Sequence, residues 1–248
     1  MEPVFRTLEI AAAAAARAVG SEITVEGLEN IPLRGGAVIA INHTSYIDFL
    51  PAGLATRRRR RRIRFMLKAE MQDVGIVNFL IRHTGAIPVD RSAGAGAYAE
   101  AVRRLRAGEL VGVYPEATIS RSFELKEFKS GAARMALEAR VPIIPTIVWG
   151  AHRIWTKDHP KRLGRNKIPI TVRVGRPLPP AGTASRLDSA LRTSMTALLH
   201  EVQQQYPHPA GEYWVPYRLG GGAPTPLQAR LREDAEMAAR MRRSAERH

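Results

Sequence analysis

The sequence of 248 residues contains no cysteine and no long uninterrupted apolar run. Without cysteine there are no disulfides, cysteine-ligated zinc ions or thiol nucleophiles, which is consistent with a reducing compartment. The nearest candidate for a membrane span, Leu8 to Val19, contains Glu9 and Arg17, and a bilayer needs roughly 18 to 20 apolar residues. Glu2 and Glu9 also disfavour a secretory signal, so we expect a protein of the cytoplasm, dissolved or attached to a surface.

Metal-binding and nucleic-acid-binding patterns are also missing. No two of the seven histidines are spaced as His-x-x-x-His, so no metal site is predicted. Aromatic residues make up only 6% of the chain, and neither an RNP-like motif nor a recognisable helix-turn-helix accompanies the basic residues. Nucleic acid is therefore not expected as a partner, and a basic nucleic-acid-binding protein is kept only as the alternative from another functional class.

Positive charge is what the sequence has in excess. The formal net charge is +15, and a run of arginines covers residues 57–62. Such a protein is attracted to anions: nucleic acid, anionic lipid or phosphorylated substrates. The run is consistent with docking on anionic lipid and equally with a solvated, partly disordered loop.

Short apolar runs alternate with segments of helical periodicity along the chain. Strands are predicted at 22–27, 36–42, 63–69, 110–116, 142–150 and 170–175, with a short strand or loop end at 85–91. Helices are predicted at 3–18, 72–82, 96–106, 126–140 and 187–204, followed by a linker at 220–226 and a charged helix. This alternation predicts an α/β fold: a single domain with a mostly parallel central sheet flanked by helices, preceded by an N-terminal amphipathic helix.

The segment "AINHTSYIDF", residues 40–49, places His43 and Asp48 five positions apart after an apolar strand. Ser45 to Asp48 has the Ser-x-x-Asp pattern of a capping box, and on spacing alone this structural interpretation is the commoner one. Pro51 complicates a helix that begins at Ser45, because proline lacks a backbone donor. Alternatively, the buried strand delivers His43 to the carboxyl edge of the sheet, where Asp48 orients it as a general base.

Three further segments combine polar groups with strand ends. In "VYPEATISRS", residues 113–122, Glu116 follows a strand, and hydroxyls and a guanidinium suited to an anion come after it. In "GAIPVDRS", Arg91 follows a short strand, although an Asp-Arg pair is also common on surfaces. In "VPIIPT", residues 141–146, two prolines bracket an apolar run and suggest an edge strand or a pocket wall.

In their order and spacing, these four segments resemble the glycerolipid acyltransferase family, specifically the 1-acylglycerol-3-phosphate acyltransferases, over roughly residues 20–180. The run that begins at Glu116 is most similar to a branch from high-GC bacteria. Two positions depart from the family pattern: Ala117 replaces a usual glycine, and Ile119 stands where arginine is usual. Arg121, two residues further on, is the candidate replacement for that arginine.

The resemblance implies the glycerolipid acyltransferase fold and transfer of an acyl chain from acyl-CoA to the free hydroxyl of a lysophosphatidate. His43 is then the general base and Asp48 orients it. The implied substrate-binding residues are Glu116 for the glycerol portion, with the following for the phosphate and its surroundings: Arg91, Arg121, Thr118 and Lys68. No cofactor or metal is implied, since acyl-CoA is a co-substrate.

The implied organisation is a membrane-docking helix at residues 1–20, an acyltransferase domain at 21–219, and a linker with a charged helix at 220–248. The implied partners are lysophosphatidic acid, acyl-CoA and an anionic membrane surface, with peripheral attachment at the cytoplasmic face of the cell membrane. The sequence leaves three alternatives open: another lysolipid or glycerol 3-phosphate as acceptor, acyl carrier protein as donor, and a thioesterase that uses water. It does not predict the oligomeric state.

Overall fold

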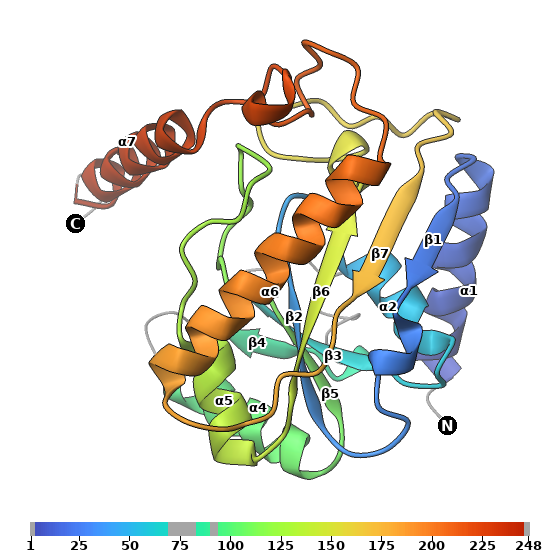
Figure 1. The fold of residues 1–248 in the computed structure, drawn as a ribbon, viewed down its shortest axis with the longest axis vertical. Helices are drawn as coiled ribbons and strands as arrows, with labels where there is room; N and C mark the ends of the chain where they lie inside the picture. Colours follow the sequence, from blue (N-terminus) through green and yellow to red (C-terminus); the bar gives the residue numbers. More distant parts are fainter. Residues whose placement is uncertain (1–2, 69–82, 90–93, 246–248) are drawn as a thin grey trace.

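The computed structural model describes residues 3–68, 83–89 and 94–245. In these residues seven strands form one sheet in the order β1-β7-β6-β2-β5-β3-β4 (Figure 1). All neighbouring strands are parallel except β6 and β7, which are antiparallel. The predicted α/β domain with a mostly parallel sheet and flanking helices is confirmed.

The regular elements follow the expected alternation. The strands are β1 (Ile23–Glu26), β2 (Ala37–Ile41), β3 (Ile63–Lys68), β4 (Ile87–Val89), β5 (Leu110–Val113), β6 (Ile143–Trp149) and β7 (Ile170–Val174). The α-helices are α1 (Pro3–Ala18), α2 (Phe49–Arg57), α4 (Gly94–Arg106), α5 (Gly131–Ala139), α6 (Ala184–Gln205) and α7 (Pro226–Ala245). Short 3-10 turns are η1 (Leu28–Asn30), η3 (Ala151–Arg153) and η4 (Tyr217–Leu219).

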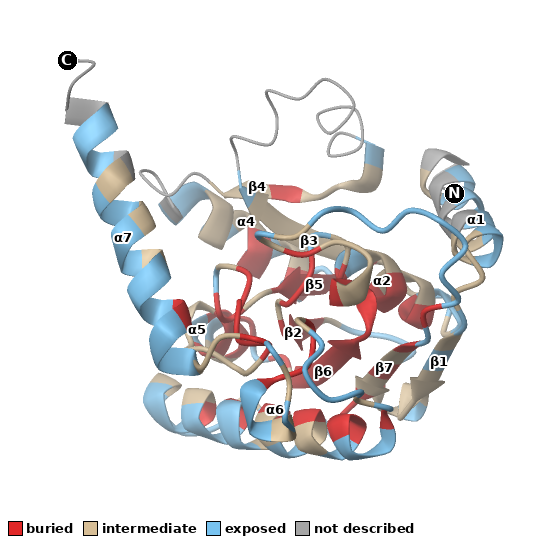
Figure 2. Ribbon diagram, turned by 90° about the horizontal axis from the view of Figure 1, so that it is seen from above, coloured by how far each residue is buried: buried red, intermediate tan, exposed pale blue. Residues whose placement is uncertain are grey.

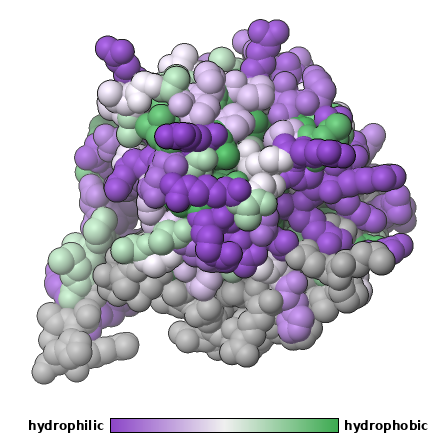
Figure 3. All heavy atoms as spheres, turned by 90° about the horizontal axis from the view of Figure 1, so that it is seen from below, coloured by the Kyte–Doolittle hydropathy of each residue, from purple (hydrophilic) through white to green (hydrophobic). Residues whose placement is uncertain are grey.

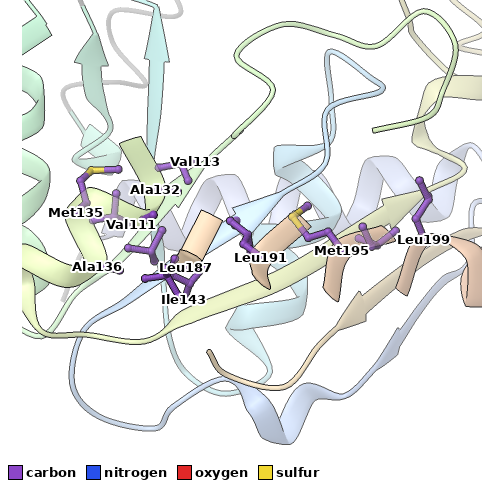
Figure 4. Close-up of a cluster of buried hydrophobic side chains, with 14 of the residues drawn as sticks. Val111, Val113, Ala132, Met135, Ala136, Ile143, Leu187, Leu191, Met195 and Leu199 are labelled. Carbon is purple, nitrogen blue, oxygen red and sulfur yellow. The ribbon is translucent and has the colours of Figure 1, made fainter. Parts of the chain in front are cut away.

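The core lies on both faces of the sheet, and β2 shows why its sequence is almost wholly apolar. Alternate side chains of a strand point to opposite faces. Val38 and Ala40 join a cluster with residues of α4, α5 and α6, part of which is shown in Figure 4. Ala37, Ile39 and Ile41 join a second cluster with residues of α2. Figure 2 shows the resulting buried centre, with more exposed helices around it.

The largest errors in the predicted boundaries concern two segments that Glu116 belongs to or contacts. The strand predicted for 110–116 ends at Val113, because Ala117 N–H donates to Tyr114 O (2.9 Å) and closes a turn. The helix predicted from residue 126 begins only at Gly131. The backbone donors of its expected first turn bond to other groups. Lys126 N–H donates to the Glu116 carboxylate (3.0 Å), and Lys129 N–H donates to Pro115 O (2.8 Å). The helix predicted at 72–82 lies outside the described residues.

The arginine run fastens loops at the amino-terminal edge of the central strands. Arg61 donates to the carbonyl oxygens of Pro32 and Gly35, which precede β2, and of Gly108, which precedes β5 (2.7–2.8 Å). Arg59 donates to Ile31 O at 3.3 Å. Part of the run is therefore structural.

The described residues that face the viewer in Figure 3 are mostly hydrophilic, with small apolar areas between the polar groups. Among the described residues, no helix combines the length and the apolar character that crossing a membrane requires.

Candidate active site

The residues predicted to carry chemistry follow neighbouring parallel strands. His43 comes two residues after β2, Glu116 three residues after β5, and Lys68 is the last residue of β3. Parallel strands present their carboxyl ends at one edge of a sheet. The structure thus places these three residues at a common edge, opposite the loops that Arg61 fastens.

His43 and Asp48 are in contact. His43 Nδ1 lies 3.2 Å from Asp48 Oδ2, the His43 side chain is 18% exposed, and Asp48 is fully buried. The same oxygen accepts hydrogen bonds from the backbone N–H groups of Thr44 and Ser45, both at 2.8 Å. Burial raises the pKa of Asp48, while the hydrogen bond and charge of His43 and the two backbone donors oppose that rise. An orienting acceptor at Nδ1 leaves Nε2 as the ring nitrogen able to take a proton.

The capping-box interpretation of Ser45 and Asp48 is half realised. Ser45 N–H donates to the Asp48 carboxylate, as in a capping box. The Ser45 hydroxyl instead donates to Trp155 O at 2.6 Å, and α2 begins at Phe49, directly after Asp48. Pro51 lies in the first turn of α2, where no intrahelical donor is needed. The structural and the functional interpretation therefore involve the same carboxylate oxygen, Asp48 Oδ2.

Glu116 connects its own segment, residues 113–122, with the segment that contains His43. Its Oε1 accepts the backbone N–H of His43 at 2.8 Å and its Oε2 accepts that of Lys126 at 3.0 Å. Glu116 is buried, and this burial raises its pKa to about 7, although the two backbone hydrogen bonds and the charge of Lys126 oppose the shift. The carboxylate of Glu116 therefore holds the backbone of His43 in place.

The loop after Glu116 holds the other side of the histidine backbone. Ser120 N–H donates to His43 O at 2.8 Å. Two residues of this loop, Ala117 (φ 60°) and Phe123 (φ 57°), adopt the left-handed conformation that disfavours a β-carbon. Non-glycine residues in this region cost free energy and often occur at functional sites. A glycine at position 117 would adopt this conformation without that cost.

Tyr114 is a site residue that sequence reasoning passed over. Its ring stacks on the imidazole of His43, with ring centroids 4.0 Å apart and an interplanar angle of 19°. Burial, and secondarily the charge of Asp48, raises the pKa of the Tyr114 hydroxyl well above its ordinary value, so the phenol stays neutral. Its place in the segment "VYPEAT", at the end of a strand next to that of His43, was the available signal.

Of the four residues predicted around the substrate phosphate, three are described, and their surroundings differ. Lys68 is exposed at the end of β3, two strands away from β2 and therefore roughly 10 Å from it. Thr118 Oγ1 accepts a hydrogen bond from Lys126 Nζ at 2.6 Å. The Arg121 side chain is only 3% exposed. Arg91 lies outside the described residues.

The guanidinium of Arg121 is surrounded by carboxylates from distant parts of the chain. Its Nε lies 2.5 Å from Asp158 Oδ2, and its Nη2 pairs with Glu236 of α7. The neighbouring Lys126 pairs with Glu233 at 2.5 Å. Asp158 and Glu236 are 37 and 115 residues away from Arg121, so no local sequence pattern could have indicated them. In the described residues, no group of three or more histidine, aspartate or glutamate side chains is arranged to hold a metal ion.

Comparison with known proteins adds independent information. Residues 22–149 match the model of a family described as Acyltransferase. The chain is 28% identical over 142 residues to a 1-acyl-sn-glycerol-3-phosphate acyltransferase of Borreliella burgdorferi (56% of this chain, 56% of the relative). It is 29% identical over 129 residues to a protein of the same name from Bacillus subtilis (52% and 63%). The aligned part thus spans between half and two thirds of these relatives' own length.

A solved structure shows the same fold. The crystal structure of the 1-acyl-sn-glycerophosphate acyltransferase from Thermotoga maritima superposes with a TM-score of 0.69. The match covers 83% of this chain and 82% of that one, at 22% sequence identity. At this identity the likeness supports the architecture, and the chemistry must be argued from the residues of this chain.

Proposed function

Because the chain belongs to the acyltransferase family, we propose that it moves a long-chain acyl group from acyl-CoA to the free hydroxyl of 1-acylglycerol 3-phosphate, giving phosphatidic acid. The observation that carries this proposal is the His43–Asp48 pair at the carboxyl edge of the sheet. The names of the similar proteins from Borreliella burgdorferi and Bacillus subtilis support the choice of acceptor.

In the proposed reaction, His43 Nε2 takes the proton of the acceptor hydroxyl. At the same time, the oxygen of that hydroxyl attacks the carbonyl carbon of the thioester. Asp48 stabilises the imidazolium that forms. The tetrahedral intermediate then expels the thiolate of CoA, which receives the proton from His43. The products are the new ester and free CoA, and His43 is regenerated in its neutral form.

The acceptor is proposed to bind through its glycerol and phosphate groups. Glu116 would accept from the glycerol portion, using lone pairs that its two backbone donors do not occupy. Arg91, Arg121 and Lys68 are the proposed phosphate partners. Of these, Arg121 would have to exchange at least one carboxylate partner for the phosphate.

We expect His43→Ala to reduce acyl transfer by about a hundred- to ten-thousand-fold, the usual contribution of a general base. The measurement is release of free CoA from a long-chain acyl-CoA, with and without 1-acylglycerol 3-phosphate. His200→Ala, on α6, is the matched histidine control and should retain activity. The same assay with an acyl-loaded carrier protein decides which donor is used.

Other outcomes of this assay distinguish the alternatives. Release of CoA without any acceptor would indicate a thioesterase. Transfer to other lysolipids or to glycerol 3-phosphate, but not to 1-acylglycerol 3-phosphate, would correct the substrate. Full activity of a folded His43→Ala variant would contradict the proposed base.

We also propose that the protein attaches peripherally to the cytoplasmic face of the cell membrane, where such lipid substrates reside. The net charge of +15 supports attraction to anionic lipid. The amphipathic helix α1, which exposes Ile10, supplies an apolar contact. Sedimentation with anionic and neutral vesicles at low and high salt tests this attachment.

A further inference from the structure

Helix α7 is attached to the rest of the protein mainly through charge. Glu233 pairs with Lys126 at 2.5 Å, and Glu236 pairs with Lys157 at 2.9 Å and with Arg121. The leucine and methionine side chains of the helix are exposed, so burial of apolar surface contributes little to this attachment. Partly exposed ion pairs are individually weak. Helix α7 is therefore suited to detach while the domain stays folded.

Arg121 is the most buried of these cations, and one of its donors is unused. Its side chain is 3% exposed, and its Nε lies 2.5 Å from Asp158 Oδ2. Its Nη1 donates no hydrogen bond, and Glu233 Oε1 is 3.9 Å from it. A buried donor without an acceptor costs free energy. The carboxylates of α7 therefore satisfy this guanidinium only in part, and a ligand with more acceptor oxygens would satisfy it better.

The charges around Arg121 balance only while α7 is attached. We call Arg121, Lys126 and Lys157 the cation cluster. Asp158 is its carboxylate partner from the domain, and the two other carboxylates belong to α7. Among the described residues that pair here, detachment of the helix leaves two more positive than negative charges. A phosphate monoester carries a charge of about −1.5 to −2 at pH 7 and offers three strong acceptor oxygens, so it matches the cluster that α7 would leave.

The cation cluster borders the candidate active site. Ser120, on the loop that carries two of the cations, donates its N–H to His43 O at 2.8 Å. Thr156, directly before Lys157, donates its hydroxyl to Thr44 O at 2.7 Å. The two loops of the cluster are therefore bonded to the loop of the proposed base, and α7 extends from the upper end of the domain in Figure 1. A phosphate bound at the cluster would belong to a molecule close to His43.

Lys126 is placed to supply a cation that the neighbouring motif lacks. Ile119, at the position where arginine is usual, is buried and apolar. Lys126 Nζ donates at 2.6 Å to the hydroxyl of Thr118, the residue next to Ile119. The ammonium group of Lys126 thus lies beside the motif position that carries no charge in this chain.

We propose that the cation cluster binds the phosphate of the acceptor, and that the carboxylates of α7 compete with this phosphate for the cluster. Lys126 and Lys157 are then substrate-binding residues that no motif marks. Glu233 and Glu236 act as an internal competitor, which the phosphate displaces. The choice of a phosphorylated acceptor rests on the proposed function, whereas the competition itself is argued from the ion pairs.

The test measures binding of glycerol 3-phosphate, the water-soluble portion of the proposed acceptor, by isothermal titration calorimetry of the full chain. Glu233→Gln with Glu236→Gln should tighten binding by about three- to tenfold, because the cluster is open in a larger fraction of the chains. Lys126→Gln should weaken binding by about tenfold, since a charge-assisted hydrogen bond is lost. A purely structural ion pair would shift binding in the same direction whichever partner is changed.

Matched variants separate the cluster from net charge. Asp234→Asn with Glu212→Gln also removes two carboxylates, both exposed, and should leave binding within about twofold of wild type. Lys167→Gln removes one exposed lysine and is the control for Lys126→Gln. Lys157→Gln is a second cation variant, on another loop, and should also weaken binding. Glycerol, which has no phosphate, should bind measurably to none of these proteins.

Competition is reciprocal, so the ligand should also loosen the helix. In wild type, glycerol 3-phosphate should speed amide hydrogen exchange in α7, because a helix without tertiary contacts opens more readily in water. Glycerol at the same concentration should leave the exchange unchanged.

Three outcomes would overturn the proposal. One is that the folded variant with Glu233→Gln and Glu236→Gln binds glycerol 3-phosphate no more tightly than wild type. Another is wild-type binding by both lysine variants of the cluster. The third is equal tightening by the control pair of carboxylates, which would mean that only net charge matters.

Failure of the proposed function gives a different result. If no acyl transfer is found with any donor or acceptor, but the variants still shift glycerol 3-phosphate binding in opposite directions, the anion site stands and the reaction must be revised. If transfer to 1-acylglycerol 3-phosphate occurs and its KM is the same in wild type and in all cluster variants, only the competition proposal fails.

Discussion

At the residue scale, His43 is held by its own loop, through Asp48, and by the loop that follows β5. Glu116 accepts its backbone N–H, Ser120 donates to its carbonyl, and Asp48 contacts its ring nitrogen. Tyr114 covers one face of the ring. In its proposed role as the base, His43 would lose little conformational freedom in the transition state, because its orientation is set before the substrate arrives.

Ala117 gives a prediction about the strain in the neighbouring loop. Its φ of 60° is unfavourable for a residue with a β-carbon. Ala117→Gly should raise the free energy of unfolding by up to about 1 kcal/mol, since relief of strain is partly offset by the larger freedom of glycine in the unfolded chain. Urea unfolding at neutral pH measures this change. A loss of stability would show that the loop does not strain residue 117.

Glu116 gives a prediction about pH. Its pKa is about 7 in the folded protein and ordinarily 4.5, so between these values the folded state keeps a proton that the unfolded state releases. Its contribution to stability is therefore fully present below about pH 4.5 and is lost as pH rises to about 7, by an amount of order 3 kcal/mol.

The variant Glu116→Gln should remove this part of the pH dependence. Urea unfolding of both proteins at about pH 5 and about pH 8 measures the two slopes. Asp48, whose pKa is also raised, contributes in the same direction in both proteins. The difference between the slopes therefore reports Glu116. Equal slopes would mean that its carboxylate is not desolvated as the structure indicates.

At the element scale, β2 must enter the sheet close to helix α4. A β-carbon at Gly36, directly before β2, would lie 2.1 Å from the carbonyl oxygen of Leu105 in α4. At Gly131, the first residue of α5, nothing lies within 4 Å of the same position. These two glycines form a matched pair, since only the first is required by close packing.

We expect Gly36→Ala to lower the free energy of unfolding by roughly 1 to 3 kcal/mol, because the backbone of α4 must move. Gly131→Ala should leave stability unchanged or raise it by up to about 1 kcal/mol, because alanine favours the helix. Thermal or urea unfolding measures both. A similar effect at the two positions would contradict the close approach of Gly36 to α4.

At the scale of the whole molecule, positive charge is spread over both edges of the sheet. Arg59 and Arg61 are bonded to backbone carbonyls at the amino-terminal edge, while Lys68 is exposed at the carboxyl edge. Attraction of the protein to an anionic surface is therefore a property of its total charge, and the orientation on that surface has to come from apolar groups.

Binding of the protein to anionic vesicles should accordingly depend on salt. We expect at least a tenfold loss of affinity between about 0.05 M and 0.5 M NaCl, because screening shortens the range of the electrostatic attraction. Sedimentation with anionic and neutral vesicles measures this. Equal binding to both kinds of vesicle would contradict peripheral attachment by charge, and tighter binding to duplex DNA would favour the nucleic-acid alternative.

Local sequence patterns determined much of the fold and the centre of the site. The apolar run of β2 needs burial on both faces, so it had to be a central strand, and His43 had to follow it at the carboxyl edge. The same argument placed Glu116 after β5. These features depend on residues close together in the chain, where periodicity and spacing carry the information.

Only the tertiary structure decided the contacts between distant segments. The first turn expected at residue 126 is absent because Glu116 takes a backbone donor there, and Arg121 is enclosed by Asp158 and Glu236. Likewise, the pattern of α7 shows an amphipathic helix, but not which side faces outward. Long-range ion pairs determine the orientation of the helix. Two charges pair according to their positions in the folded protein, and such a pairing produces no periodic pattern in the sequence.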